Sequence, residues 1–505
     1  MSADHHSTGL DPYEQIERLQ QQLQLSEMRV RRLEELMRLM LIHKYGAKSE
    51  QLNQAQLALL QVEPGVSDLE IEGESQRSPV DSPEMKPRSK HPGRQALPEH
   101  LPRVERVVEC PPEQRKCATC EQEKVVIGYE TSEQLDVEPA KYFVLVTKRE
   151  KRACPKCTAR GVVCAPLESR IIDKALASDR LIVDTIVAKY CDHLPLYRQS
   201  AMLERDSGVE ISRATMTDWV MRVGELLMPV VGQMRRDLLR NRYLQADETP
   251  IEVQMHDGRG RNHQAYLWQY GRPNGEVVFD FQLGRGREGP KRFLDRFAGV
   301  LQTDGYSAYD ALANPELVHA ACWAHCRRAF SDAVKLSPED KVAIAIVARI
   351  DELFAVDAQA RTSGMDQQQR QQLRHEKAPA ILASLKAQIE TAVSQALPGT
   401  KFSQACQYTL KLWPRLLYFV EYPEVELSTN LAENSMRPIA VGRKNWIHLG
   451  SKFAGPKVAA ILSVLETCRR LRIPVRDYLA SVLPGLANRS VRRLQNLTPS
   501  AWASI

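Results

Sequence analysis

The segments 243-YLQADETP-250 and 299-GVLQTDG-305 share one pattern, Leu-Gln-x-Asp, in which a short apolar run ends in an acid. Apolar runs of this length that stop at a polar residue are typical of buried strands. Further strands are predicted at residues 265–270, 277–281 and 318–322, with a short amphipathic helix at 291–297. The predicted order is therefore three strands, helix, strand, helix, strand, which indicates an α/β sheet.

That order is the one a ribonuclease-H-like sheet requires. In such a sheet the first and fourth strands are neighbours, so we expect Asp247 and Asp304 to lie side by side. Two like charges at close range are unfavourable unless a cation lies between them. Carboxylate oxygens suit Mg²⁺, and two such ions activate an attacking oxygen and stabilise a leaving one in phosphoryl transfer. The alternative is a pair of strand-end acids that cap nearby helices.

Three other acids in this region, Glu248, Asp280 and Asp310, are not expected in the site. Glu248 directly follows Asp247, so its side chain should point to the opposite face if the strand continues.

The segment 428-STNLAENSMRPIAVGRKNWIHLG-450 contains one acid, Glu433, in a basic field. From Leu431 to the end, twelve Lys and Arg residues face only three acids, which favours a polyanionic partner. Taken alone, Asn430 and Glu433 resemble a capping box, with Arg437 placed for a helical ion pair. With two upstream aspartates, Glu433 is better interpreted as a third metal ligand. Predicted DNA contacts nearby are Arg437, Arg443, Lys444 and Lys452, with Trp446 either stacked on a base or in the core.

Composition limits the remaining possibilities. The 505 residues are enough for several domains, and the net charge of +6 is mild, so local charge matters more than the total. No apolar run approaches a membrane span, and the N-terminus lacks a signal pattern. We therefore expect a cytoplasmic, nucleoid-associated protein without membrane contact. Eleven cysteines in that reducing compartment are better interpreted as metal ligands or buried small residues than as disulfides.

Four of those cysteines form two CxxC pairs, Cys117 with Cys120 and Cys154 with Cys157. Between the pairs, residues 135–137 and 142–146 are predicted to be strands. Two such pairs joined by a hairpin supply four thiolates for a tetrahedral structural zinc ion, and they leave no open position for catalysis. Cys110 and Cys164 are interpreted as non-ligands.

Residues 13–45 are predicted to form one long helix with apolar residues at alternating spacings of three and four. The seam positions are Ile16, Leu19, Leu23, Ser26, Val30, Leu33, Met37 and Met40. Such a pattern predicts a coiled coil and a homo-oligomer. The alternative is an amphipathic helix packed on its own chain.

Residues 170–240 are predicted to be helical, with a turn at Asp206-Ser207-Gly208 and a new helix near Ser212. This outline resembles a helix-turn-helix, although any two packed helices share it. Arg213, with Thr215 and Thr217, is the candidate for DNA contact.

The chain is thus predicted to be a multidomain α/β protein. Its expected parts are a coiled coil (1–61), a Pro- and Ser-rich linker (62–103), a zinc-binding domain (104–168), a helical DNA-binding domain (169–240), a first core part (241–332), an all-helical insertion (333–427), a second core part (428–479) and a basic C-terminal tail with little pattern (480–505).

Four motifs, LQADETP, LQTDGYSAYD, CWAHCRRAF and LAENSMRPIAVGRKNW, together with the cysteine pairs, resemble bacterial DDE transposases of the insertion sequence sixty-six family. The resemblance spans nearly the whole chain. It implies a ribonuclease-H-like core interrupted by a helical insertion, and binding of the element's terminal inverted repeats and target DNA. It also implies small companion proteins. Cys322 and His325 resemble a motif of other DDE families and are expected to support the active site.

The expected function is Mg²⁺-dependent DNA cleavage and strand transfer with Asp247, Asp304 and Glu433 as catalytic residues. Two alternatives remain open at this point. One is a DNA-binding regulator with an inactive core, and the other is a structure-selective nuclease on the same core.

Overall fold

The computed structural model is a mixed α/β protein that describes residues 12–45, 122, 141–153, 162–258, 260–312 and 314–503. The predicted linker at 62–103 and the four predicted zinc ligands lie outside these residues. The chain divides into two units, one comprising Met1–Ser78 and Val146–Ile505 and the other Pro79–Leu145. Among the residues described, no helix is both long and apolar enough to span a bilayer.

A six-stranded sheet forms the centre of the larger unit. Its strands are β3 (Tyr243–Val253), β4 (His263–Gly271), β5 (Val277–Gln282), β6 (Gly299–Thr303), β7 (Leu317–Ala321) and β8 (His448–Leu449). The order is β5-β4-β3-β6-β7, with β8 paired to the far end of β3. The first three strands are antiparallel, whereas β6 and β7 run parallel to β3. The predicted strands are confirmed, and so is the prediction that the first and fourth are neighbours.

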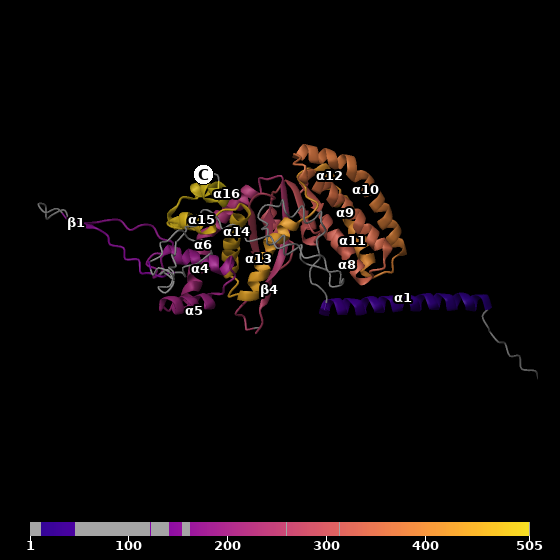
Figure 1. Cartoon of the computed structure of the whole chain (residues 1–505), viewed down its shortest axis with the longest axis horizontal. Coiled ribbons are helices and arrows are strands. Elements are labelled where there is room, and N and C mark those ends of the chain that lie inside the picture. Colours follow the sequence, from indigo (N-terminus) through magenta and orange to yellow (C-terminus); the bar gives the residue numbers. More distant parts are fainter. Residues whose placement is uncertain are drawn as a thin grey trace, which may run out of the picture. The chain divides into compact units, whose positions relative to one another are not determined.

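Two helices that follow the predicted insertion pack on this sheet (Figure 1). Helix α13 (Asn430–Trp446) contacts β3 and β4, and α14 (Ala454–Arg470) lies against β5 and the long helix α6 (Arg213–Leu238). Helix α14 also covers the edge of the sheet. Ser463 Oγ accepts from the Phe279 amide (2.8 Å) and Thr467 Oγ1 from the Val277 amide (3.0 Å). These bonds occupy donors that an open edge strand would expose.

Between residues 170 and 240 the chain forms helices α4 (Asp179–Tyr190), α5 (Leu196–Ser207) and α6, which come directly before the sheet. Helix α5 ends at Gly208, whose φ of +70° is a left-handed conformation that glycine adopts without strain. Helix α6 begins after Ser212, whose hydroxyl accepts from the Thr215 amide at 3.2 Å. The predicted helix, turn and helix are therefore confirmed as elements.

Between β7 and α13 the chain forms helices α8 (Trp323–Leu336), α9 (Lys341–Thr362), α10 (Gln367–Gln395), α11 (Lys401–Leu416) and α12 (Tyr418–Glu421), which lie together in Figure 1. The prediction that this region is helical is confirmed. The helices share a second apolar core with the sheet, in which Phe354, Leu385 and Ile389 belong to the same cluster as Val300 and Ala320. A buried ion-pair network crosses it, in which Asp357 contacts both Arg370 and Arg374.

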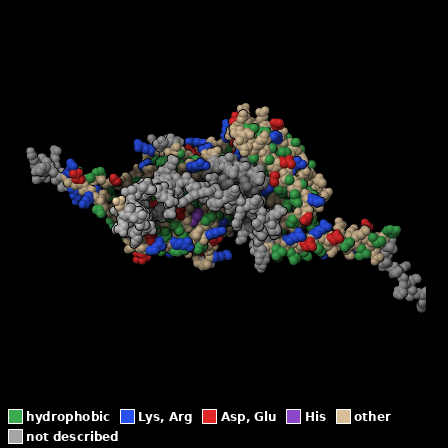
Figure 2. All heavy atoms as spheres, in the orientation of Figure 1, with side chains coloured by type: hydrophobic (Ala, Val, Ile, Leu, Met, Phe, Trp, Pro, Cys, Tyr) green, Lys and Arg blue, Asp and Glu red, His purple; other side chains and the backbone are tan. Residues whose placement is uncertain are grey.

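The predicted N-terminal helix is confirmed as α1 (Pro12–Tyr45). Its apolar seam residues are exposed, from 51% of the side chain at Val30 to 70% at Met40. Figure 2 shows hydrophobic side chains at the surface of this helix among charged ones.

Two structural predictions are wrong. Residues 141–150 have no regular structure, and Phe143, Val144 and Leu145 are largely exposed, so the apolar run 142–146 is not a strand. Such a run becomes a strand only when a neighbour accepts its backbone hydrogen bonds, and among the described residues the short hairpin of β1 (Lys151–Ala153) and β2 (Val162–Cys164) forms further along.

The C-terminal segment is the second error, because residues 480–505 are not a tail with little pattern. After α15 (Val475–Val482) they form η4 (Leu486–Asn488), η5 (Val491–Leu497) and α16 (Pro499–Trp502). Leu483, Leu486 and Leu494 are buried, and η5 packs against α6. The segment therefore belongs to the core of the larger unit.

Candidate active site

Asp247 and Asp304 occupy matching positions on neighbouring parallel strands. Tyr243 lies opposite Val300 and Gln245 opposite Gln302, so the same register continued by two residues aligns Asp247 with Asp304. Asp247 lies within β3, whereas Asp304 directly follows β6. The chain turns sharply after Asp304, where Gly305 has a φ of +90°. A side chain at this position would also meet Leu412 of α11. The structure thus brings together the backbones of the two predicted aspartates.

The Asp247 carboxyl is half-buried beside other acids. Burial, reinforced by the negative charges of Glu433 and Glu248, raises its pKa to about 7, although His325 opposes the shift. One oxygen accepts from the Glu248 amide at 2.9 Å. A nearby cation would stabilise the ionised form of a carboxyl in such surroundings, because it offsets the repulsion between the acids.

Glu433 lies in the first turn of α13 and is held by two cations from α8. Arg328 Nη2 donates to its two carboxylate oxygens at 3.0 and 3.4 Å, and His325 Nε2 lies 3.4 Å from Oε1. The capping box interpretation is wrong. The residue before the helix is Thr429 rather than Asn430, and no side chain caps it. The Glu433 carboxylate faces α8 because two cations there offer a stronger attraction than a backbone amide.

Cys322 directly precedes helix α8, and His325 lies in the first turn of that helix. Cys322 is fully buried, and its sulfur accepts from the amide and the hydroxyl of Thr429 at 3.3 and 3.4 Å. Burial alone would raise the pKa of the Cys322 thiol, but His325 and Thr429 outweigh it and the pKa is lowered. Burial likewise opposes the charge on His325, yet Cys322 and Glu433 raise its pKa to about 9. The pair therefore connects the end of β7 with the turn that carries Glu433.

The three acids interpreted as lying outside the site each pair with an arginine, although Glu248 is still near enough to Asp247 for its charge to raise the pKa of that carboxyl. Glu248 pairs with Arg285 at 2.6 Å, Asp280 with Arg292 at 3.5 Å and Asp310 with Arg415 at 2.5 Å. Within the described part of the chain, no three His, Cys, Asp or Glu side chains are gathered closely enough to hold a metal ion.

Comparison with known proteins supplies the context for this geometry. The family model described as "Transposase IS66 family" matches residues 174–456, more than half of the chain, and this range includes Asp247, Asp304 and Glu433. The chain belongs to the IS66 family of transposases. Two further models match upstream, "Transposase C of IS166 homeodomain" over 32–106 and "zinc-finger binding domain of transposase IS66" over 114–158. The zinc-finger match contains all four predicted zinc ligands and excludes Cys110 and Cys164.

Relatives that match this IS66 family member over most of both chains occur in Sinorhizobium fredii. The uncharacterized protein y4qI is 34% identical over 481 residues, which cover 91% of this chain and 86% of the relative. The uncharacterized protein y4jD is 32% identical over 491 residues and 92% of each chain.

The predicted DNA contacts of the IS66 family member have different surroundings. Arg213, Lys444 and Lys452 are exposed. Arg443 instead ties α13 to β3, because its Nη1 donates to Thr249 Oγ1 at 3.1 Å and to the Pro250 carbonyl at 2.6 Å. Arg437 is half-buried.

Trp446 is also half-buried, and it packs against the hydrophobic core with Lys189 Nζ 5.9 Å from its ring. This position favours the core interpretation of Trp446 over stacking on a base.

Two residues near the carboxylates were not predicted. Arg328 lies one turn after His325 on α8, so the spacing of three in CWAHCRRAF was a usable signal for one shared helix face. Tyr408 on α11 donates its hydroxyl proton to the Asp304 carbonyl. Nothing local in the sequence signals that contact, because the two residues are distant along the chain.

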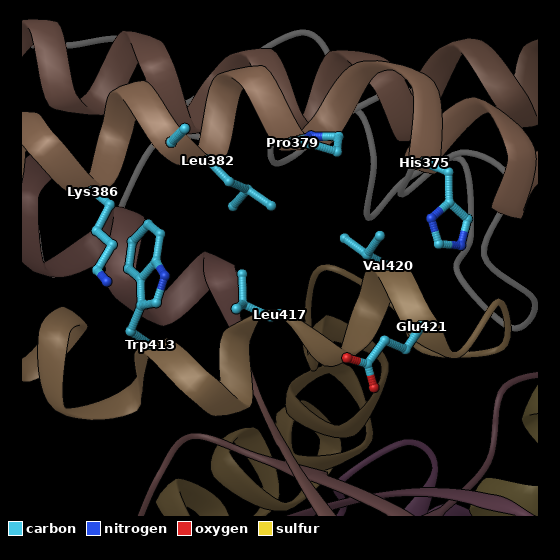
Figure 3. A pocket seen from close by; sticks show the side chains of 9 residues that line it. His375, Pro379, Leu382, Lys386, Trp413, Leu417, Val420 and Glu421 are labelled. Carbon is cyan, nitrogen blue, oxygen red and sulfur yellow. The ribbon is translucent and has the colours of Figure 1, made fainter.

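A pocket of about 440 Å³ lies between α10, α11 and α12 (Figure 3). Leu382, Trp413 and Leu417 contribute apolar walls, and Lys386 and Glu421 lie at its margins. None of the predicted site residues lines it, so it has no part in the candidate chemistry.

Proposed function

We propose that this IS66 family member is a DDE transposase that cleaves DNA at the ends of an insertion sequence and joins them to target DNA. Asp247, Asp304 and Glu433 are its catalytic acids, on a ribonuclease-H-like core. The observation that carries the proposal is the shared register of β3 and β6, which aligns Asp247 in β3 with Asp304 directly after β6, together with Glu433 close enough to Asp247 to raise its pKa.

The donor set fits Mg²⁺, because three carboxylates from separate elements supply hard oxygen ligands and two of them already repel each other. Two bound ions would supply activation of the attacking oxygen and stabilisation of the leaving one. The chain's own residues hold Asp247 within a rigid strand and Glu433 on a helix that packs against that strand.

Arg328 and His325 hold Glu433 in the state described, so ligation requires Glu433 to exchange these partners. His325 stays protonated at neutral pH because its pKa is about 9. Arg328 and His325 then remain as cations beside the carboxylates, where the negative phosphodiester approaches.

Other parts of the chain would recognise and pair DNA ends. The zinc-finger region binds a structural zinc ion through Cys117, Cys120, Cys154 and Cys157. Arg213 on α6 and the cations Arg437, Lys444 and Lys452 contact phosphates of the terminal inverted repeats or of the target. The α1 seam assembles copies of the chain, and small companion proteins of the element join the complex. The protein acts in the cytoplasm, on the nucleoid.

Replacing Asp247 with Asn tests this function. The change keeps the side-chain shape and removes a ligand charge, so strand transfer on a labelled inverted-repeat substrate should fall below detection while DNA binding is retained. Asp280→Asn is the matched control, because Asp280 lies in the same sheet but pairs with Arg292, and its activity should stay near that of the wild type.

Three outcomes would change the assignment. Strand transfer that survives Asp247→Asn would refute the catalytic triad. Wild-type cleavage without joined products would indicate a structure-selective nuclease. DNA binding without any Mg²⁺-dependent cleavage would indicate a regulator with an inactive core.

A further inference from the structure

The glutamines of the two Leu-Gln-x-Asp motifs belong to one buried polar cluster. Tyr243, Gln245 and Gln302 are 6%, 1% and 0% exposed. The Tyr243 hydroxyl donates to Gln302 Oε1 at 2.5 Å and accepts from Gln245 Nε2 at 2.8 Å. Central strands of a covered sheet are usually apolar, so a cluster of three buried polar side chains on β3 and β6 is costly unless its groups are satisfied.

Gln245 Oε1 has no hydrogen-bond partner among the described residues, and Gln302 Nε2 also donates to the Ala321 carbonyl. The cluster's other hydrogen bonds to the rest of the chain go to the four residues through which the chain returns from the helical insertion. Gln302 Nε2 donates to the Glu426 carbonyl at 2.6 Å, and the Glu426 amide donates to the Tyr243 hydroxyl at 3.2 Å. Gln245 Nε2 donates to the Ser428 carbonyl at 3.0 Å. Two of the four residues are therefore held directly by strands β3 and β6.

The end of β7 holds the other two residues of this segment. The Trp323 amide donates to the Leu427 carbonyl at 2.9 Å, and Cys322 accepts from the Thr429 amide at 3.3 Å. Each residue from Glu426 to Thr429 is thus fixed through its backbone, two of them by side chains of strands β3 and β6 and two by the residues that join β7 to α8.

This arrangement replaces a helix cap. Helix α13 begins directly after Thr429, and no side chain caps its first turn. The Glu433 amide donates to the Thr429 carbonyl at 3.0 Å, so Glu433 lies one turn beyond the clamped segment. A helix start without a side-chain cap frays unless something else fixes it, and here the buried bonds to residues 426–429 do so.

We infer that Tyr243, Gln245 and Gln302 are positioning residues that fix segment 426–429 and thereby aim Glu433 at Asp247. The inference rests on the proposed function, because it concerns the acid that the function assigns to metal binding. It also explains why the glutamine precedes each aspartate by two residues. That spacing puts the glutamine and the aspartate of each motif on the same face of the sheet. On that face the glutamines bind the segment before α13, and the aspartates belong to the proposed site with Glu433.

The test compares metal binding by the full chain and its variants. Gln302→Leu removes both amide donors at similar volume, and Tyr243→Phe removes a single hydroxyl. Each should weaken Mn²⁺ binding, followed by electron paramagnetic resonance of the free ion, by about tenfold for Gln302→Leu and about threefold for Tyr243→Phe. We call Tyr243, Gln245 and Gln302 the clamp. Hydrogen exchange of a peptide spanning 426–433 should become faster in both variants, because the weakened clamp no longer fixes that segment.

Gln199→Leu is the matched control. Gln199 is also a buried glutamine whose Nε2 donates to two backbone carbonyls, those of Leu194 (2.9 Å) and Thr185 (3.4 Å), but it belongs to α5. It should lose stability without changing Mn²⁺ affinity or the exchange of 426–433.

The inference is overturned if both clamp variants bind Mn²⁺ as the wild type does, or if Gln199→Leu weakens binding equally. If Gln302→Leu does not fold, Tyr243→Phe decides alone. The variant Glu433→Gln distinguishes failure of the clamp from failure of the proposed function. If that change leaves Mn²⁺ affinity intact, the assignment of Glu433 in the proposed function fails, whereas loss of binding in Glu433→Gln with normal clamp variants refutes only the clamp.

Discussion

At the scale of single residues, Glu433 has the most constrained surroundings in the candidate site. Its carboxylate contacts Arg328 and His325, and its negative charge raises the pKa of Asp247. The same oxygens cannot serve Arg328 and a metal ion equally well. Arg328 is therefore a competitor of the metal for Glu433 in the proposed site.

Replacing Arg328 with Gln removes that competing charge and leaves a shorter, uncharged hydrogen-bond donor. A half-exposed ion pair is worth about 1 kcal/mol, so Mn²⁺ should bind about fivefold more tightly. The measurement is a Mn²⁺ titration at fixed pH. Arg349→Gln is the control, since Arg349 pairs with Glu352 on α9 at 2.9 Å. Weaker binding in the Arg328 variant would mean that Arg328 supports the site instead of competing for it.

Single residues also show where sequence reasoning reaches its limit. Asp247 and Asp304 could be aligned in advance because a repeated motif on parallel strands fixes the register. The capping box predicted at Asn430 does not form, because residues distant in the sequence determine the contacts there. Thr429 donates to Cys322, and Glu433 pairs with two cations on α8. A local sequence pattern does not predict with which of several distant cations a carboxylate will pair.

At the scale of elements, the insertion is tied to the sheet through Glu426. Its side chain pairs with Arg361 and Arg370, while its backbone belongs to the clamp on α13. Arg370 and Arg374 also bind Asp357. The ion pairs of α9 and α10 thus continue into the segment that leads to Glu433.

Replacing Asp357 with Asn should destabilise the insertion by about 3 kcal/mol, because it leaves buried guanidinium charge without its partner. Urea unfolding followed by circular dichroism measures the loss. Glu352→Gln, which breaks only an exposed pair with Arg349, should change little. Equal stability of the two variants would contradict the importance of the network.

The same network predicts a dependence on pH. Although burial opposes its charge, Arg374 and Arg370 hold the pKa of Asp357 well below its usual range. A depressed pKa contributes stability above the unfolded value of about 3.9, and this contribution is lost as pH falls from there toward the folded pKa. The wild type should therefore lose stability more steeply below about pH 4 than Asp357→Asn does.

Elements with local signals were the predictable ones. Ser212 and Gly208 mark helix ends by their own chemistry, so α5 and α6 could be placed from the sequence. The folding of the chain after α15 could not be predicted, because Leu486 and Leu494 lie in short 3₁₀ segments without helical periodicity. Both leucines are buried, and η5, which carries Leu494, packs against α6, far away in the sequence.

At the scale of the whole molecule, α1 exposes an apolar seam to solvent in the single chain. Leu23 and Leu33 are 62% and 60% exposed. Exposed leucines at heptad spacing are unfavourable in water, and pairing with the same helix of a second copy buries them. We propose that copies of the chain associate through this seam, which would bring two DNA ends together in the proposed reaction.

The double change Leu23→Glu with Leu33→Glu places like charges at an a and a d position of that seam. We expect the full chain to dissociate to monomers by sedimentation equilibrium, because buried carboxylates would face each other across the helix pair. Gln21→Glu adds a charge on the outer face of the same helix and should leave the mass unchanged. Products that join two DNA ends should decline with the mass, while binding to a single end persists, because the proposed catalytic acids and DNA contacts lie outside α1. A seam variant that keeps the wild-type mass would show that the helix packs on its own chain.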